Sequence, residues 1–288
     1  MAAPRLALLI PAYNEESRIG PVLARYAQAC RAAWPGHVRI TVVLNGCRDN
    51  TLAVVQQAAA SWPEIEWLDF PAPIGKGGAL IEGLQHALAS GADIIGYVDA
   101  DGATPPAAFL ELARRCAEGE ADCLIGSRWL PGSVLHRRQP RLRRFLSRGF
   151  HAIVQMLFWM SIQDTQCPAK VVRRAALEQV MTSLRIADLA FDVNLLYALH
   201  RVGTRIREVP VEWEDQAGSK VTASLGRSCL VMFLSVARLR LVYSPLYKWL
   251  APLRPLETWL YLKLHAPPPH PRHVAEARSP VSPQDTRS

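Results

Sequence analysis

Asp99 and Asp101 stand one residue apart, directly after the apolar run Ile94–Val98. Paired carboxylates at the end of a buried strand can hold a hard divalent cation such as Mg²⁺ or Mn²⁺. Such a cation acts as a Lewis acid and offsets charge on a departing diphosphate. The pair could instead cap a helix, because Asp101 and Thr104 precede Pro105. We expect Asp99 and Asp101 to be metal ligands, with helix capping as the alternative.

Two glycine-containing segments could bind phosphate groups. Residues 75–78 read Gly-Lys-Gly-Gly and open a predicted helix. Glycines there let the backbone approach a ligand, and a helix N-terminus favours an anion. Residues 218–220 read Gly-Ser-Lys and offer a hydroxyl and an ammonium group. Ordinary surface turns are the alternative for both segments.

Two more aspartates, Asp164 and Asp192, lie in apolar surroundings. Each could cap a helix or be a buried structural carboxylate. A catalytic role for either of them needs support from the rest of the sequence.

The elements that must position these residues alternate along the first 127 residues. Strands are predicted at Leu6–Ile10, Arg39–Leu44, Glu64–Phe70, Ile94–Val98 and Cys123–Gly126, and helices near 16–33, 50–61, 77–90 and 105–118. This alternation predicts an α/β fold with a mostly parallel sheet flanked by helices. Ligands bind at the carboxyl ends of such strands. Polar or glycine-rich segments follow all five predicted strands, at 11–16, 45–51, 75–78, 99–102 and 126–128.

Composition excludes several classes of protein. The chain has 288 residues, of which half are hydrophobic and a fifth charged, so disordered, collagen-like and coiled-coil chains are excluded. Six cysteines show no CxxC pair, which predicts free thiols in a reducing compartment. The first apolar run has five residues, too few for a signal peptide, and no stretch is long enough to predict a membrane-spanning helix.

The second half of the chain is basic and could lie on a membrane surface. Residues 1–135 carry a net charge of −4 and residues 136–288 a net charge of +12. Six arginines between positions 137 and 148 lead into an apolar segment that ends at 162, and a similar block spans 229–250. Basic residues beside aromatic-rich apolar runs are typical of helices in a membrane interface. Two core helices with basic flanks are the alternative, and the apolar runs argue against nucleic-acid binding.

We therefore divide the chain into three parts. Residues 1–222 are expected to form the catalytic domain, with an interfacial insert near 137–162. Residues 223–264 are expected to form amphipathic helices on the membrane surface. Six prolines within residues 265–288 predict a disordered tail.

In their order along the chain, these motifs resemble glycosyltransferase family 2, in particular the polyprenyl-phosphate and dolichyl-phosphate glucosyl- and mannosyltransferases. The matching segments are PAYNEE (11–16), GKGGAL (75–80), DADGAT (99–104), GSR (126–128), SRGFH (147–151), DTQC (164–167), FDVNLL (191–196) and EVPVEW…GSK (208–220). The resemblance covers about residues 6–245. It implies a Rossmann-like GT-A fold, a nucleotide-diphospho-sugar donor of the UDP-glucose or GDP-mannose type, and inversion at the anomeric carbon.

The resemblance also implies roles for individual residues. Donor-binding residues would be Pro11, Tyr13, Glu15, Asn45, Lys76, Asp99 and Ser219. Asp99 and Asp101 would hold Mg²⁺ or Mn²⁺ against the donor diphosphate. Arg148, Ser219 and Lys220 would bind the acceptor phosphate, and the reaction centre would contain Asp101, Arg128, Asp192 and Lys220.

Three segments depart from the family pattern. Leu44-Asn45-Gly46-Cys47 stands where DDGS or NDGS is usual, which leaves the nucleobase open. DTQCPAK replaces DTQCGFK, and Asn194 stands where a carboxylate is common. A sugar hydroxyl needs a general base, whereas a phosphomonoester is already anionic near neutral pH. Asn194 therefore favours a lipid-phosphate acceptor.

The sequence predicts a peripheral enzyme on the cytoplasmic face of a membrane that transfers a hexose to a polyprenyl phosphate. A family-2 transferase with a saccharide hydroxyl acceptor is one alternative, with Asp192 as its base. A sugar-phosphate nucleotidyltransferase is another, although its glycine-rich loop after the first strand is absent. The third is a sugar-nucleotide-binding membrane protein that has lost catalysis. The sequence sets no oligomeric state.

Overall fold

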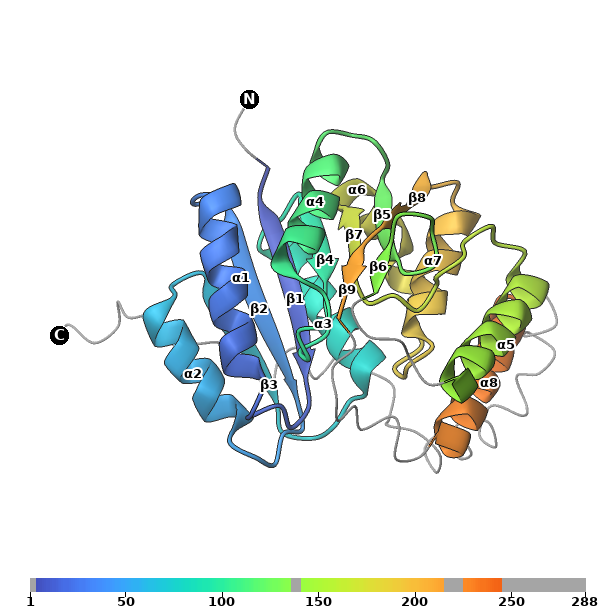
Figure 1. Cartoon of the computed structure of the whole chain (residues 1–288), viewed down its shortest axis with the longest axis horizontal. Coiled ribbons are helices and arrows are strands. Elements are labelled where there is room, and N and C mark those ends of the chain that lie inside the picture. Colours follow the sequence, from blue (N-terminus) through green and yellow to red (C-terminus); the bar gives the residue numbers. More distant parts are fainter. Residues whose placement is uncertain (1–3, 136–140, 215–224, 245–288) are drawn as a thin grey trace.

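A seven-stranded mixed sheet forms the centre of the protein, in the order β3-β2-β1-β4-β7-β5-β8 (Figure 1). The computed structural model describes residues 4–135, 141–214 and 225–244. The strands are β1 (Leu6–Ala12), β2 (Val38–Asn45), β3 (Ile65–Phe70), β4 (Ile94–Tyr97), β5 (Cys123–Ser127), β7 (Lys170–Arg173) and β8 (Ile206–Pro210). Strand β7 runs antiparallel to β4 and β5, and the other pairs are parallel. A separate two-stranded pair joins β6 (Val134–Leu135) to β9 (Glu212–Trp213).

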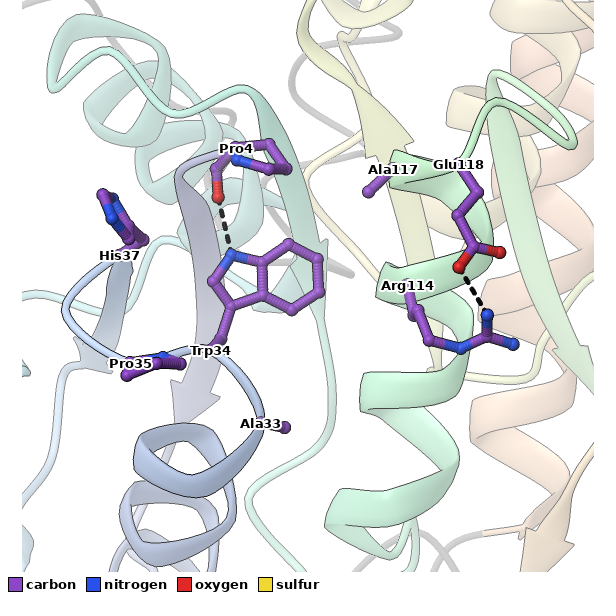
Figure 2. A pocket seen from close by; sticks show the side chains of 8 residues that line it. All are labelled: Pro4, Ala33, Trp34, Pro35, His37, Arg114, Ala117 and Glu118. Atoms are coloured by element: carbon purple, nitrogen blue, oxygen red, sulfur yellow. Dashed lines mark hydrogen bonds and ion pairs between the residues drawn. The ribbon is translucent and has the colours of Figure 1, made fainter. Parts of the chain in front are cut away.

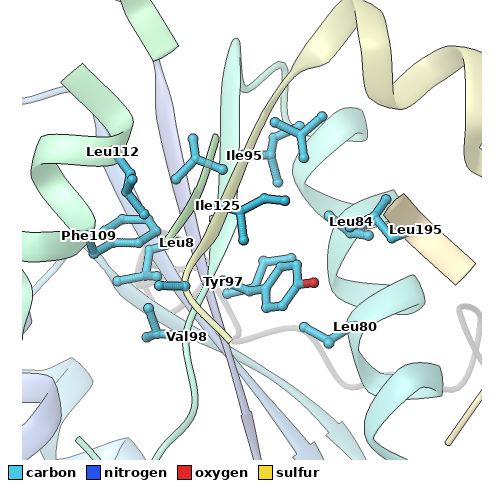
Figure 3. Packing of buried hydrophobic residues seen from close by; sticks show 14 of the residues in the cluster. Leu8, Leu80, Leu84, Ile95, Tyr97, Val98, Phe109, Leu112, Ile125 and Leu195 are labelled. Carbon is cyan, nitrogen blue, oxygen red and sulfur yellow. The ribbon is translucent and has the colours of Figure 1, made fainter. Parts of the chain in front are cut away.

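Helices cover both faces of this sheet. They are α1 (Ile19–Ala33), α2 (Thr51–Ser61), α3 (Lys76–Ala89), α4 (Pro106–Ala117), α5 (Arg141–Phe158), α6 (Arg174–Val180), α7 (Phe191–Arg201) and α8 (Leu225–Val242), with a 3₁₀ turn at Met181–Ser183. Figure 3 shows the two layers of the core. Phe109 and Leu112 of α4 pack on one face of the sheet, and Leu80, Leu84 and Leu195 of α3 and α7 pack on the other. The predicted α/β fold is confirmed.

Strand β4 shows how the sequence satisfies both layers. The ring of Tyr97 points towards α3 and meets Phe191 edge to face, with ring centroids 6.1 Å apart. On the opposite face, a Cβ at Gly96 would lie 2.7 Å from the ring of Phe109. The glycine therefore lets α4 approach the strand closely, which places the segment after β4 between two packed helical layers.

All five predicted strands and all four predicted helices are present, with shifts of at most three residues at their ends. The largest shift is at the first helix, which begins at Ile19. Residues before it form a turn in which the N–H groups of Arg18 and Ile19 both donate to the carbonyl of Glu15.

Helices α5 and α8 lie side by side at one end of the molecule (Figure 1). They belong to the two segments predicted to lie on a membrane. None of the helices in the described parts of the chain is long and apolar enough to cross a bilayer. The predicted tail at 265–288 lies outside the described residues, and so do residues 223–224 and 245–264 of the predicted segment 223–264.

Candidate active site

The carboxyl ends of β1, β2 and β4 bring the predicted site segments to one edge of the sheet. Because β1 pairs in parallel with both β2 and β4, all three strands end at this edge. The segments that begin at Pro11, Asn45 and Asp99 therefore lie at neighbouring strand ends, as the sequence predicted.

Lys76 and Asp99 form an ion pair at this edge, with Nζ 2.6 Å from Oδ1. Lys76 is the first residue of α3, so the helix places its ammonium group beside the aspartate that follows β4. Burial alone would lower the pKa of Lys76. The attraction of Asp99 and then of Asp192 outweighs burial, and the pKa lies above its usual value. The ammonium group therefore stays charged at neutral pH.

Asp101 lies close enough to Asp99 for their charges to interact. Burial, followed by the repulsion of Asp99, raises the pKa of the Asp101 carboxyl above its usual value. Its Oδ1 accepts a hydrogen bond from the backbone N–H of Ala103 at 3.0 Å. The alternative that Asp101 caps the next helix does not fit, because α4 begins later, with Pro105 at its N-cap position and no side-chain capping bond.

Two carboxylates in this relationship suit a divalent cation that a diphosphate completes. No group of three or more metal-ligating side chains occurs within the described residues. Mg²⁺ is commonly bound through one or two carboxylates together with substrate phosphates and water. Asp99 and Asp101 fit that mode of binding, and their role as ligands stays a prediction.

The loops after β1 and β2 are tied together by hydrogen bonds. Thr51 Oγ1 accepts from the N–H of Glu15 at 2.8 Å, and Asn14 Oδ1 accepts from the N–H of Arg48 at 2.7 Å. Asn14 adopts a φ of 55°, which turns the chain between Tyr13 and Glu15. This bonding gives the predicted nucleotide pocket a defined backbone.

The predicted donor-binding side chains in these loops have different surroundings. The side chain of Tyr13 is 46% exposed and could stack on a base. The Glu15 carboxylate binds Arg18 through two hydrogen bonds of 2.7 and 2.8 Å. Asn45 is buried, and its Oδ1 accepts from the N–H of Ile74 at 2.7 Å. Asn45 thus holds the segment before α3 in place through the same oxygen that could have met a nucleobase.

Arg128 pairs with Asp164, the aspartate of the DTQC motif. Nε and Nη2 donate to the two carboxylate oxygens at 2.7 and 2.8 Å, and the backbone N–H of Arg128 donates at 3.0 Å. Burial alone would raise the pKa of Asp164, but Arg128 outweighs it and the pKa is lowered. The guanidinium also lies 5.0 Å from the ring centroid of Trp213. Arg128 is thereby held rigidly after β5.

Asp192 is buried together with Lys170 and Tyr97, two partners that the sequence did not predict. Its Oδ1 accepts hydrogen bonds from Lys170 Nζ and Tyr97 Oη, each at 2.6 Å. Lys170 also donates to the carbonyl of Cys167. Asp192 is 3% exposed, so a sugar hydroxyl could not reach it without opening the core. Its predicted role as a proton acceptor is not favoured by this burial.

Asn194 has a structural role in the fold, and its type does not indicate the acceptor as predicted. Its side chain is fully buried in α7. Oδ1 accepts from the N–H groups of Arg185 and Ile186 at 2.8 and 3.1 Å, and Nδ2 donates to Ser183 O and Tyr243 Oη, both at 3.2 Å. A residue buried in this way cannot act as a base, so the absence of a carboxylate here says nothing about the acceptor.

The remaining predicted site residues lie apart from Lys76, Asp99 and Asp101 or outside the described part of the chain. Arg148 is exposed on α5. Ser219 and Lys220 lie outside the described residues.

A hollow of about 550 Å³ lies at the opposite end of the strands, near the C-terminal ends of α1 and α4, and is lined by Trp34, His37 and Arg114 among others (Figure 2). None of the predicted site residues lines it.

Comparison with known proteins gives a family match over most of the described chain. The family model "Glycosyl transferase family 2" matches residues 7–181. The chain is 34% identical over 225 residues to a dolichyl-phosphate beta-glucosyltransferase of Trichomonas vaginalis, covering 75% of this chain and 66% of that protein. It is 30% identical to the glycosyltransferase AglD of Haloferax volcanii, covering 76% of this chain and 35% of that protein. The chain thus spans about two thirds of the first relative and about a third of the second.

A further relative and two solved structures extend this comparison. Polyprenol monophosphomannose synthase of Mycolicibacterium smegmatis is 27% identical, covering 74% of this chain and 78% of that protein. Glucosyl-3-phosphoglycerate synthase of Mycobacterium tuberculosis, solved with Mn²⁺, UDP and glucosyl-3-phosphoglycerate, has a TM-score of 0.58 at 19% identity, covering 82% of this chain and 80% of that one. Its complex with Mg²⁺ and UDP has a TM-score of 0.59 at 19% identity, covering 82% and 79%. These structures share the GT-A fold with the chain.

Proposed function

The chain belongs to glycosyltransferase family 2, and we propose that it transfers a hexose from a nucleotide-diphospho-sugar to a polyprenyl phosphate. The observation that carries the proposal is the grouping of Lys76, Asp99 and Asp101 at the carboxyl edge of the sheet. Relatives named for dolichyl phosphate and polyprenol acceptors support the choice of acceptor.

The donor diphosphate would lie against Asp99 and Asp101. A bound Mg²⁺ or Mn²⁺ would neutralise charge on the leaving nucleoside diphosphate. The solved GT-A neighbours in complex with UDP and either cation support this expectation. Lys76 would contribute a second positive charge, and the exposed ring of Tyr13 would cover the base.

The transfer would be a single inverting displacement. An oxygen of the polyprenyl phosphate attacks the anomeric carbon, and the bond from that carbon to the diphosphate oxygen breaks. No proton has to be removed from the acceptor, because the phosphate is already anionic near neutral pH. The burial of Asp192 against Lys170 and Tyr97 supports this chemistry, since it leaves a hydroxyl acceptor without that base. Arg128, Arg148, Ser219 and Lys220 remain our candidates for phosphate contacts.

The end of the molecule formed by α5 and α8 would face the membrane. Large apolar side chains are exposed there: Met156 is 70% exposed, Trp159 85%, Phe233 43% and Leu241 46%. Exposed aromatic and apolar side chains beside basic residues suit an anionic interface. We propose peripheral attachment at the cytoplasmic face, where a lipid-linked acceptor would be within reach.

A transfer assay with two panels tests this function. Labelled UDP- and GDP-hexoses are offered with Mg²⁺ or Mn²⁺, and the acceptors are polyprenyl phosphate, the corresponding free polyprenol and simple saccharides. We expect label in the organic phase with one donor, and only with the phosphorylated lipid. Transfer to a saccharide instead would replace the proposal with a hydroxyl-acceptor transferase. Metal-dependent nucleotide binding without any transfer would indicate an inactive binding protein.

A further inference from the structure

The segment 183–190 lies between α8 and the end of the sheet that carries Lys76, Asp99 and Asp101, which we call the donor edge. It joins the 3₁₀ turn Met181–Ser183 to α7 and packs against the first turn of α3. The N–H of Gly78 donates to the carbonyl of Ala187 at 3.1 Å. A Cβ at Gly77 would lie 2.4 Å from Ile186 O and 2.7 Å from Phe191 Cβ. The first turn of α3 therefore cannot move relative to this segment without a clash or a lost hydrogen bond.

That turn carries the ammonium group of the donor site. Lys76 precedes Gly77 and Gly78 directly, and its Nζ lies 2.6 Å from Asp99. Segment 183–190 therefore contacts the helix turn from which the Lys76 side chain reaches Asp99. Displacements of about 1 Å at a positioning group can lower a rate by about a hundredfold.

Helix α8 and the residue after it hold the same segment from the other side. Ser235 Oγ donates to Asp188 Oδ2 at 2.5 Å, and Asp188 Oδ1 accepts from the N–H of Ala190 at 2.7 Å. Both side chains are buried, at 1% and 8% exposed. The carboxylate therefore joins α8 to the start of α7.

Tyr243 makes the second connection. Its hydroxyl donates to Ser183 O and accepts from Asn194 Nδ2, both at 3.2 Å. Asn194 in turn holds the N–H groups of Arg185 and Ile186. The ring of Tyr243 lies edge to face with Tyr197, with centroids 4.9 Å apart. Two hydroxyl groups, one within α8 at Ser235 and one directly after it at Tyr243, thus bind segment 183–190.

We propose that Ser235 and Tyr243 are positioning residues for the donor site, acting through segment 183–190 on Lys76. The proposal rests on the proposed function, because it concerns the binding of that function's donor. The contacts of Ser235 and Tyr243 also connect α8, at the end of the molecule proposed to face the membrane, with the donor edge.

The test compares variants that each lack a hydroxyl group. In the test variants the deleted hydroxyl binds segment 183–190, and in the control variant it does not. Ser235→Ala, Tyr243→Phe and the double variant remove the connections. Tyr197→Phe is the matched control, because it removes a hydroxyl from the same aromatic cluster without a bond to residues 183–190. Calorimetry on the full chain measures the Kd of UDP and of GDP in the presence of Mg²⁺. Steady-state assays measure KM for the donor and for polyprenyl phosphate.

We expect the Kd of the nucleotide that binds the wild type to rise at least fivefold in the double variant and less than twofold in Tyr197→Phe. KM for the donor should rise with it, and KM for polyprenyl phosphate should not. A lower Tm with unchanged Kd and donor KM would overturn the proposal, since the hydroxyls would then only stabilise the fold. If Ser235→Ala fails to fold, the nucleotide Kd and the donor KM of Tyr243→Phe are compared with those of Tyr197→Phe, and an increase is expected only in Tyr243→Phe. A wild type that binds neither nucleotide would overturn the proposed function itself, and this inference with it.

Discussion

The ammonium group of Lys170 lies 2.6 Å from the carboxylate of Asp192, and both side chains are buried beneath the donor edge of the sheet. Tyr97 donates to the same carboxylate oxygen. Tyr97 is the last residue of β4, two positions before Asp99, so this buried group supports the strand end that carries the proposed metal ligands.

Breaking this pair from one side should be costly. Lys170→Met leaves the Asp192 carboxylate buried without its cation, and we expect the free energy of unfolding to fall by about 3–5 kcal/mol. Replacing both residues, as in Lys170→Met with Asp192→Leu, should cost much less than the sum of the two single changes. Urea unfolding of the four proteins in this double-mutant cycle measures the coupling. Additive effects would contradict the burial of the pair.

Asn194→Asp tests whether this position is structural. The change removes the amide donor to Ser183 O and Tyr243 Oη and places a buried carboxylate there. We expect a loss of about 2–4 kcal/mol of stability, because buried groups lose their partners. We expect no gain of transfer to saccharides. A stable variant that acquires such transfer would show that residue 194 can reach the acceptor.

Glu82 should make stability depend on pH. Burial in α3 raises the pKa of its carboxyl from 4.5 to about 7. The folded chain then binds this proton more tightly than the unfolded chain, so the contribution of Glu82 to stability falls as pH rises from about 4.5 to about 7. The loss is on the order of 3 kcal/mol.

Glu82→Gln should remove that part of the pH dependence. Urea unfolding at several pH values between 4.5 and 8 compares the variant with the wild type. The stability of the variant relative to the wild type should increase steadily across this window and level off above pH 7. Parallel pH profiles for the two proteins would contradict the raised pKa.

Trp159 should contribute to membrane attachment. Its side chain is 85% exposed at the end of α5, beside Met156. Trp159→Ser with Met156→Ser should weaken binding to anionic vesicles about tenfold, because apolar area that enters the interface is lost. Co-sedimentation measures this binding. Val202→Ser, at an exposed apolar residue beyond the end of α7, is the control and should bind like the wild type. Equal binding by all three proteins would count against this surface.

Local patterns were sufficient to predict most of the sheet. Each of the first five strands is a short apolar run followed by a polar or glycine-rich segment, and the helices between them are amphipathic. Strand β7 was not predicted, because only Val171 and Val172 of its four residues are apolar and it gains its place by pairing antiparallel between β4 and β5. Such a pairing depends on contacts distant in sequence.

The same reason explains which site residues could be predicted. Asp99, Asp101 and Lys76 follow strand ends and so are visible in the sequence. The partners of Asp192 come from β4 and β7, and its distance of 95 residues from Tyr97 hides that contact. The structural role of Asn194 is not visible in the sequence, because its four hydrogen bonds form only when segment 183–186 and Tyr243 surround it. Lys170 follows the DTQC motif closely, and this was the one signal that could have drawn attention to it.

Sugar transfer to polyprenyl phosphate, measured for the wild type, Asp101→Ala and Asp122→Ala with Mg²⁺ and the active donor, tests directly whether the end of β4 is the catalytic centre. Asp122 pairs with Arg205 near the start of β5, at the opposite edge of the sheet, so its loss removes a carboxylate without touching the proposed site. We predict that label in the organic phase falls at least a hundredfold in Asp101→Ala and less than threefold in Asp122→Ala. Transfer by Asp101→Ala at the rate of the wild type would contradict the assignment of this strand end as the catalytic centre.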